Sequence, residues 1–179
     1  MSVTRVAYAA EGWGEGELWL EGARLVWHEL PRPQVSPHPG GARSRHPLRS
    51  TIAAPSARNG VAKAPEVRRL VHRLEGYFAG ERVDFSDVPL ELDDVTGFQE
   101  QVARALRAVG YGEVVTYGEL AVLAGHPNAQ RAAGTFCAHN RYPLILPCHR
   151  VVAANGLGSY GSLGTEYKRR LLELEGVAV

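Results

Sequence analysis

Cysteine is scarce in this chain of 179 residues, which contains only Cys137 and Cys148. Two cysteines are too few for a disulfide framework or a cysteine-rich zinc site. The seven histidines show no metal-ligand spacing, and the chain has no glycine-rich phosphate loop and no paired-carboxylate signature. We therefore expect a protein that uses neither a metal nor another cofactor.

Long apolar runs are also missing, because no segment combines the length and apolarity needed to span a bilayer. The first five residues lack the basic-then-apolar pattern of an export signal. Together with the low cysteine content, these absences predict a reducing, cytoplasmic location (at the nucleoid if the source is bacterial) and no membrane partner.

Acidic residues are absent from the segment between Pro31 and Pro65, which holds six basic residues and many of the chain's prolines. The net charge of the whole chain is only +1, so the remainder is net acidic, and any nucleic-acid affinity there must come from local placement. We interpret residues 31–64 as a flexible, basic, proline-rich loop. Its cations either add nonspecific phosphate contacts or belong to a plain spacer. The basic residues are Arg32, Arg43, Arg45, Arg49, Arg58 and Lys63.

The first part of the chain is typical of a small sheet followed by a helix. Short β-type runs at 3–8, 16–20 and 24–28 are separated by glycine-rich turns, and their alternation predicts a hairpin with one buried face. An apolar stripe at helical spacing predicts a helix that begins at Pro65 and ends before Gly80. Residues 82–92 are expected to be extended.

The second half is predicted to be mostly helical. Capping-box patterns at Thr96–Gln99 and Thr116–Glu119 each open a helix. A tight turn at 125–128 and a further helix over 129–138 then predict a helix-turn-helix. After a glycine-rich loop, a last helix is expected over 165–174. The fold class is therefore α+β: a small N-terminal antiparallel-sheet domain with a helix, and a helical C-terminal domain containing a helix-turn-helix.

The run from Ile145 to Val152 contains the strongest chemical signal, because Cys148 and His149 are adjacent inside an apolar stretch. A thiolate is a strong nucleophile, and both His149 and Arg150 are of a type that lowers a thiol pKa. Adjacent side chains diverge in a regular helix or strand, so they cooperate only in a turn, which Pro147 favours, or through a water molecule. The alternative is a buried, inert cysteine, which is what we predict for Cys137.

Three further residues have both a plain and a functional interpretation. Arg131 is either a solvated helical arginine or a cationic wedge, since the small neighbours around it allow close approach to a base stack. Tyr117 is either a core aromatic or a functional phenol. Glu175 ends the last helix, where the helix dipole disfavours a carboxylate, so it is either solvated or placed there to hold an imidazole.

Together these motifs resemble the O6-alkylguanine-DNA alkyltransferases, the methylated-DNA–protein-cysteine methyltransferases. The resemblance covers about residues 65–177, and the Pro-Cys-His-Arg core is its most specific part. The matching segments are Tyr77–Arg82, Val88–Leu92, Phe98-Gln99, Tyr111–Ala121, Arg131-Ala132, Asn140, Pro147–Val152, Lys168 and Leu171–Gly176.

The resemblance implies a role for each matching residue. Cys148 would attack the alkyl carbon on O6 of guanine, or on O4 of thymine, and keep the group irreversibly as a thioether. His149 would take the thiol proton through a water, Glu175 would orient His149, and Asn140 would brace the turn. Tyr117 would protonate the flipped guanine, the carbonyls of Cys148 and Val151 would recognise it, and Tyr160 and Ser162 would form walls of the pocket. Ala129 and Gln130 would contact the DNA, and Arg131 would fill the gap left in the base stack.

The resemblance also implies a monomer whose partner is double-stranded DNA containing alkylated guanine. We expect residues 1–90 to form an N-terminal α/β, ribonuclease H-like domain that includes the loop at 31–64. Residues 91–179 would then form the domain for DNA binding and alkyl transfer. Two alternatives are a non-enzymatic sensor of alkylated bases with the same fold, which the presence of Cys148 argues against, and a cysteine hydrolase, for which no distal partner motif is present.

Overall fold

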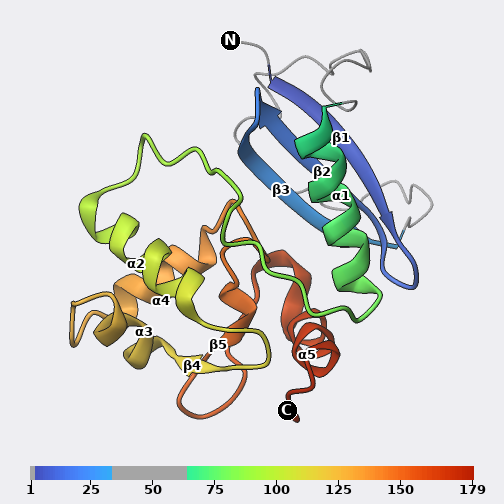
Figure 1. Ribbon diagram of the computed structural model, residues 1–179. Helices are drawn as coiled ribbons and strands as arrows, with labels where there is room; N and C mark the ends of the chain where they lie inside the picture. Colours follow the sequence, from blue (N-terminus) through green and yellow to red (C-terminus); the bar gives the residue numbers. More distant parts are fainter. Residues whose placement is uncertain (1–2, 34–63) are drawn as a thin grey trace, which may run out of the picture.

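The computed structural model describes residues 3–33 and 64–179, which form two lobes (Figure 1). One lobe combines an antiparallel sheet with a helix, and the other is mainly helical, so the predicted α+β class is confirmed. The elements of the first lobe are β1 (Val3–Ala10), β2 (Gly14–Glu21), β3 (Arg24–Arg32) and α1 (Pro65–Phe78). Those of the second are α2 (Gly97–Ala108), β4 (Val115–Thr116), α3 (Tyr117–Leu123), α4 (Gln130–Ala138), β5 (Val151–Val152) and α5 (Gly164–Leu174).

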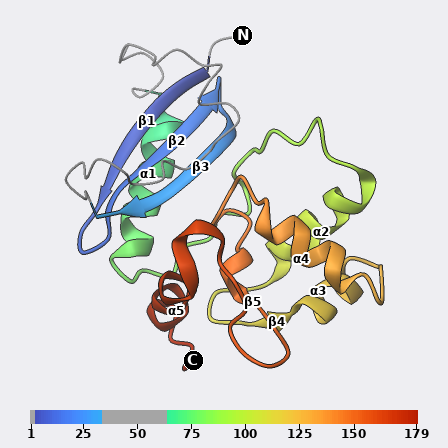
Figure 2. The same ribbon diagram turned by 180° about the vertical axis from the view of Figure 1, so that it is seen from behind.

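The N-terminal sheet has the strand order β1-β2-β3, and α1 lies across one of its faces (Figure 1). In Figure 2, which is turned by 180°, the sheet lies in front of α1. Leu18 and Leu20 of β2 are almost fully buried, as the alternation predicted. The prediction of a single buried face is wrong, however, because Trp19 on the opposite face is only 5% exposed. Trp19 pairs with Trp27 of β3, and β2 is therefore covered on both sides.

Both predicted capping boxes are present at the helix starts. The side chain of Thr96 accepts a hydrogen bond from the backbone N–H of Gln99, and Thr116 does the same for Glu119. The turn between α3 and α4 contains Gly125 with φ +82° and Asn128 with φ +74°, conformations that glycine and asparagine adopt more readily than other residues. The two helices of the predicted helix-turn-helix are therefore formed.

A short parallel ladder joins the helix-turn-helix to the segment that carries Cys148. Val115 of β4 pairs with Val151 of β5, and Thr116 pairs with Val152. Tyr117 follows β4 directly, and β5 follows the 3-10 turn Cys148–Arg150 directly. The ladder therefore holds the start of α3 next to the end of the cysteine turn.

Strand β3 extends further than predicted and connects the two lobes. It ends at Arg32, so the predicted boundary of the loop at residue 31 is wrong. Pro31 is held within the fold because the Tyr167 hydroxyl donates a 2.8 Å hydrogen bond to its carbonyl. The rest of the predicted loop, residues 34–63, lies outside the described residues. The division of the chain at residue 90 stays a prediction, and an isolated bridge from Leu25 to Leu90 runs close to it.

One hydrophobic cluster runs through both lobes. It includes Leu18 of the sheet, Leu74 and Tyr77 of α1, and Leu106 and Leu120 of the second lobe, each fully shielded from solvent. Within 3–33 and 64–179, no helix has the length and apolar character that crossing a membrane requires.

A buried histidine between the lobes makes stability depend on pH. Burial lowers the pKa of His28 from 6.5 to about 4. Between these values the unfolded chain binds a proton that the folded chain excludes, so stability is complete above pH 6.5 and is lost as the pH falls toward 4. We expect the free energy of unfolding to fall by up to about 3 kcal/mol over this range because of His28. Urea unfolding between pH 7.5 and pH 4.5 measures it.

The matched controls for this prediction are His28→Asn, which removes the titrating group, and His72→Gln, which removes an exposed histidine of α1. The contribution of His28 to the pH dependence of the free energy of unfolding should vanish in His28→Asn and persist in His72→Gln. An unchanged pH dependence in His28→Asn would contradict the assignment.

Candidate active site

Cys148 begins a 3-10 turn that continues through His149 and Arg150. The turn predicted from Pro147 is therefore present. Cys148 is 6% exposed, and the side-chain amide of Asn140 donates hydrogen bonds both to its sulfur, at 3.0 Å, and to the carbonyl of Leu146, at 2.8 Å. The backbone N–H of Cys148 donates to the same carbonyl at 2.8 Å. Asn140 thus fixes both the thiol and the backbone just before it.

The electrostatic environment of Cys148 keeps it a thiol at rest. Burial raises the pKa of the thiol, and this outweighs the lowering by the Asn140 amide, the Lys168 charge and the Tyr160 hydroxyl. We expected His149 and Arg150 to lower the pKa of this thiol, but burial has the larger effect and the pKa is raised. A base must remove the proton when the thiol reacts.

His149 follows Cys148 in the turn, and its imidazole is held by a carboxylate. Its Nε2 lies 2.7 Å from Oε1 of Glu175, and the Tyr77 hydroxyl donates to the same oxygen at 2.7 Å. An ionised carboxylate only accepts, so Nε2 carries the proton and Nδ1 has the free lone pair. Nδ1 is buried and has no hydrogen-bond partner within the described residues. Burial also lowers the pKa of His149, so the ring is neutral near pH 7.

Arg150 acts on Glu175 rather than on the thiol, contrary to the prediction. Its guanidinium donates two hydrogen bonds of 2.9 Å to the two carboxylate oxygens of Glu175 and one of 2.7 Å to the carbonyl of Val109. The backbone N–H of Gly112 also donates to Glu175, at 3.0 Å. Hydrogen bonds from His149 and Arg150 hold the pKa of Glu175 well below its usual value, despite burial. Glu175 is therefore an ionised anchor for the histidine.

Lys168 belongs to the residues that carry the family resemblance, but no role at this site was predicted for it from the sequence. It is fully buried, and its ammonium group donates to the carbonyl of Val151 at 2.6 Å. Its charge lowers the pKa of Cys148. A signal was present, because Lys168, Leu171, Leu172 and Glu175 follow the i, i+3, i+4, i+7 spacing of one helix face. Both charged members of this face are buried at the site.

Cys148 lines a pocket of about 230 Å³ between the two lobes. Tyr117 is half-buried against this pocket, and Ser162 lies at its edge, where its hydroxyl accepts a 3.1 Å hydrogen bond from Arg32 of β3. Tyr160 and Ser162, the two predicted wall residues, thus both line this pocket. Other lining residues are His28, Gly134 and Asn140.

Cys137 differs from its prediction as a core residue. It is half-buried and lines the same pocket as Cys148. Burial, and next the neighbouring Cys148, raise the pKa of Cys137 far above its usual value, so this second thiol stays protonated. Nothing in the sequence indicated this, since the pocket forms only when α4 meets β3 and the cysteine turn.

The predicted DNA-contacting residues lie at the N-terminal end of α4. Gln130 and Arg131 are exposed and Ala129 is the half-exposed N-cap. Arg131 has no hydrogen bond or ion pair from its side chain among the interactions of the described residues, whereas Gly134, one turn later, faces the ring of Tyr117. The exposed start of α4 therefore adjoins the pocket.

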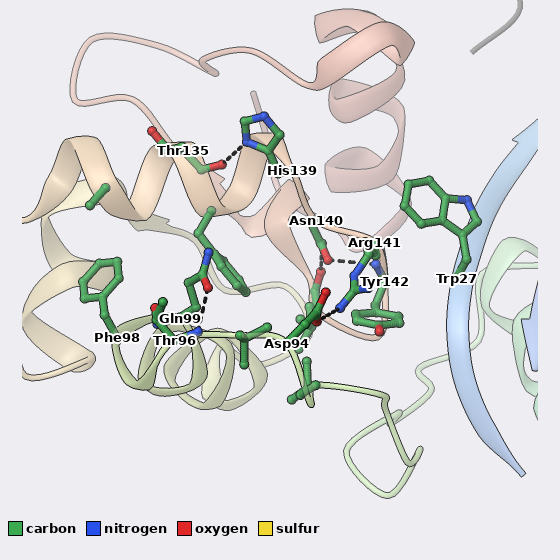
Figure 3. Close-up of a pocket in the computed structure, with 15 residues that line it drawn as sticks. Trp27, Asp94, Thr96, Phe98, Gln99, Thr135, His139, Asn140, Arg141 and Tyr142 are labelled. Atoms are coloured by element: carbon green, nitrogen blue, oxygen red, sulfur yellow. Dashed lines mark hydrogen bonds and ion pairs between the residues drawn. The ribbon is translucent and has the colours of Figure 1, made fainter. Parts of the chain in front are cut away.

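A larger cavity of about 660 Å³ lies on another face of α4 (Figure 3). Phe98 of α2 and Trp27 of β3 lie on opposite sides of it, and Thr135 of α4 and His139, the C-cap of α4, also line it (Figure 3). Trp27 and Asn140 line both cavities. No cysteine lines this larger cavity, so the nucleophile belongs to the smaller pocket.

A helix-turn-helix backed by a shielded thiol, with a histidine and a carboxylate behind it, defines a DNA-binding protein with a cysteine nucleophile. No group of three or more candidate metal ligands occurs in residues 3–33 and 64–179. Residues 97–177 match the family model described as 6-O-methylguanine DNA methyltransferase, DNA binding domain. The chain belongs to this family, and the resemblance noted from the sequence is confirmed.

Relatives support the same assignment. The chain is 52% identical over 104 residues to a methylated-DNA–protein-cysteine methyltransferase of Methanopyrus kandleri, in an alignment covering 58% of this chain and 76% of that protein. It is 49% identical over 106 residues to the protein of the same name from Mycobacterium tuberculosis, covering 59% of this chain and 62% of the relative. These alignments therefore leave about two fifths of the chain unmatched.

Solved structures match over nearly the whole chain. The crystal structure of the M. tuberculosis O6-methylguanine methyltransferase superimposes with a TM-score of 0.74 at 31% identity, covering 97% of this chain and 96% of that one. A structure of the M. tuberculosis protein in complex with DNA gives a TM-score of 0.71 at 34% identity, covering 95% and 92%.

Proposed function

We propose that this chain repairs DNA by moving one alkyl group from O6 of guanine, or from O4 of thymine, onto the sulfur of Cys148. The observation that carries the proposal is the shielded thiol of Cys148 beside a neutral His149 held by Glu175. An S–C bond forms and the C–O bond breaks, which restores the base and leaves a thioether. A thioether does not leave again readily, so each molecule acts once.

His149 serves as the general base in this proposal. Its Nδ1 takes the thiol proton through one water, and the resulting imidazolium is stabilised by the ionised Glu175 through the 2.7 Å bond at Nε2. Arg150 and Tyr77 keep Glu175 in place by the bonds described above. The burial that raises the thiol pKa also shields the developing thiolate from water, which strengthens its reaction with carbon.

Tyr117 serves as the proton donor to the leaving base. Burial raises the pKa of Tyr117, so its phenol is protonated at neutral pH. The guanine anion released at O6 takes this proton at N3 and becomes neutral, and the tyrosinate and the imidazolium left behind are neutralised by proton exchange with water. The carbonyls of Cys148 and Val151 recognise the exocyclic amine, while Tyr160 and Ser162 bound the base.

The partner is double-stranded DNA, bound through the exposed start of α4. Ala129 and Gln130 approach the groove, and Arg131 enters the base stack in place of the rotated nucleotide. An alkylated guanine pairs poorly, so extruding it costs less than extruding an intact base. We further propose that the chain acts as a monomer, since all these groups lie in one chain, and that its domains divide at residue 90.

Mass spectrometry of the intact protein after incubation with a duplex containing O6-methylguanine tests the function. We expect one methyl group on Cys148, a net gain of about 14 Da, and no second gain with excess DNA. Tight lesion binding without a mass gain would indicate a sensor, and release of product over several turnovers would indicate a hydrolase. An undamaged duplex of the same sequence is the control.

A further inference from the structure

We infer that His28, in the N-terminal sheet, is a positioning residue that holds the segment delivering Cys148. The family model covers residues 97–177 and therefore does not include β3. The inference deepens the proposed function and rests on it for its kinetic part. Neither the names of the relatives nor the sequence motifs give His28 a role.

His28 makes two short hydrogen bonds although it is only 2% exposed. Nδ1 lies 2.7 Å from the carbonyl oxygen of Pro143, and Nε2 lies 2.7 Å from the Tyr8 hydroxyl. A carbonyl only accepts, so Nδ1 carries the proton and donates it to Pro143, and Nε2 accepts from Tyr8. The backbone N–H of His28 also donates to the carbonyl of Arg141 at 2.9 Å. One residue of the sheet therefore holds the 141–143 segment at two points.

The segment held by His28 contains a backbone conformation that needs support. Leu144, the residue after Pro143, has φ +70°, a left-handed conformation that residues other than glycine rarely adopt. Such a conformation persists only where the surrounding contacts over-determine it. The bond from His28 to the preceding carbonyl is one of those contacts, and burial of Leu144 at 3% exposure is another.

This turn is directly connected to the nucleophile. The N–H of Leu146 donates to the carbonyl of Tyr142 at 2.7 Å, which closes the turn. The carbonyl of Leu146 in turn accepts from the backbone of Cys148 and from the Asn140 amide that also bonds the sulfur. If the turn relaxes, the acceptor shared by Cys148 and Asn140 moves. His28 thus acts on the thiol through Pro143, the turn and Leu146.

Two substitutions separate positioning from general destabilisation. In His28→Asn the amide nitrogen replaces Nδ1, so the bond to Pro143 is kept and the bond to Tyr8 is lost. In His28→Gln the amide reaches the place of Nε2, so the partner at Tyr8 is kept and the bond to Pro143 is lost. Both variants lose one buried hydrogen bond, and Tyr8→Phe provides a third that leaves the Pro143 bond in place.

The experiment measures three quantities for each variant: the single-turnover rate of methyl transfer, the affinity for methylated duplex, and the pH dependence of Cys148 alkylation by iodoacetamide without DNA. Peptide mass spectrometry separates Cys148 from Cys137. For His28→Gln we expect transfer about tenfold or more slower at unchanged DNA affinity, with an altered alkylation profile, because small misplacements of reacting groups are costly. His28→Asn, which keeps the bond to Pro143, should transfer faster than His28→Gln, and Tyr8→Phe should stay within about threefold of the original chain.

Equal rates in His28→Asn and His28→Gln, at matched thermal stability, would overturn the inference. The iodoacetamide measurement needs neither DNA nor repair chemistry, so it reports on the position of the thiol even if the proposed function fails. Conversely, an original chain that gains no methyl group would contradict the function alone. An altered alkylation profile confined to His28→Gln would still support the role of His28.

Discussion

Replacing Cys148 by alanine is expected to abolish alkyl transfer while DNA affinity stays within about threefold. The proposed thioether forms on the sulfur of Cys148, and the other thiol of the pocket, Cys137, stays protonated, so the loss should exceed about a thousandfold. The exposed residues at the start of α4 are not among those that line the pocket of Cys148, which is why binding should persist. Intact-protein mass spectrometry and a fluorescence binding assay with methylated duplex measure the two effects.

Cys137→Ser is the matched control, because Cys137 lines the same pocket but stays protonated. This variant should still gain one methyl group on Cys148. Methylation that persists in Cys148→Ala, at Cys137 or elsewhere, would refute the assignment of the acceptor.

Replacing Glu175 by glutamine is expected to affect both stability and transfer. The side chain of Glu175 is fully buried and that of Arg150 is 10% exposed, so the substitution leaves a buried guanidinium without its counter-ion. Breaking a buried pair in this way costs about 3–5 kcal/mol in the free energy of unfolding. Transfer should also slow by about a hundredfold, because the imidazolium of His149 loses its support. Urea unfolding and single-turnover kinetics at a temperature where the variant is folded measure these effects.

Glu173→Gln serves as the control for this change, since Glu173 is an exposed glutamate of the same helix. Its stability and rate should remain close to those of the original chain. If Glu175→Gln transferred methyl groups at the original rate, Glu175 would have a structural role only.

The elements with local signals were the most predictable from the sequence. Thr96 and Thr116 each precede a residue that completes a capping box, and both helices begin there. Cys148 and His149 stand out because two reactive side chains occur in an apolar run, and Pro147 directly precedes the 3-10 turn that contains both. In each case the determining contacts lie within a few residues of one another.

Features that depend on contacts between residues far apart in the chain could not be predicted from the sequence in the same way. Arg150 was expected to act on its neighbour Cys148, but its partner is Glu175, 25 residues away. Cys137 lines the pocket only because β3 closes over α4. Lys168 had a helical-face signal, but its acceptor, the carbonyl of Val151, is defined only by the packing of α5. The role of His28 likewise depends on a contact across 115 residues.

The two-residue ladder between β4 and β5 has a consequence for the relative positions of the proposed proton donor and the nucleophile. Tyr117, proposed to protonate one edge of the base, leaves β4, whereas the turn with Cys148, proposed to attack the opposite edge, runs into β5. The ladder therefore ties the position of Tyr117 to the position of the turn with Cys148. We therefore expect a single-residue insertion at Val115 or Val151 to slow alkyl transfer far more than substitutions on the groove-facing surface.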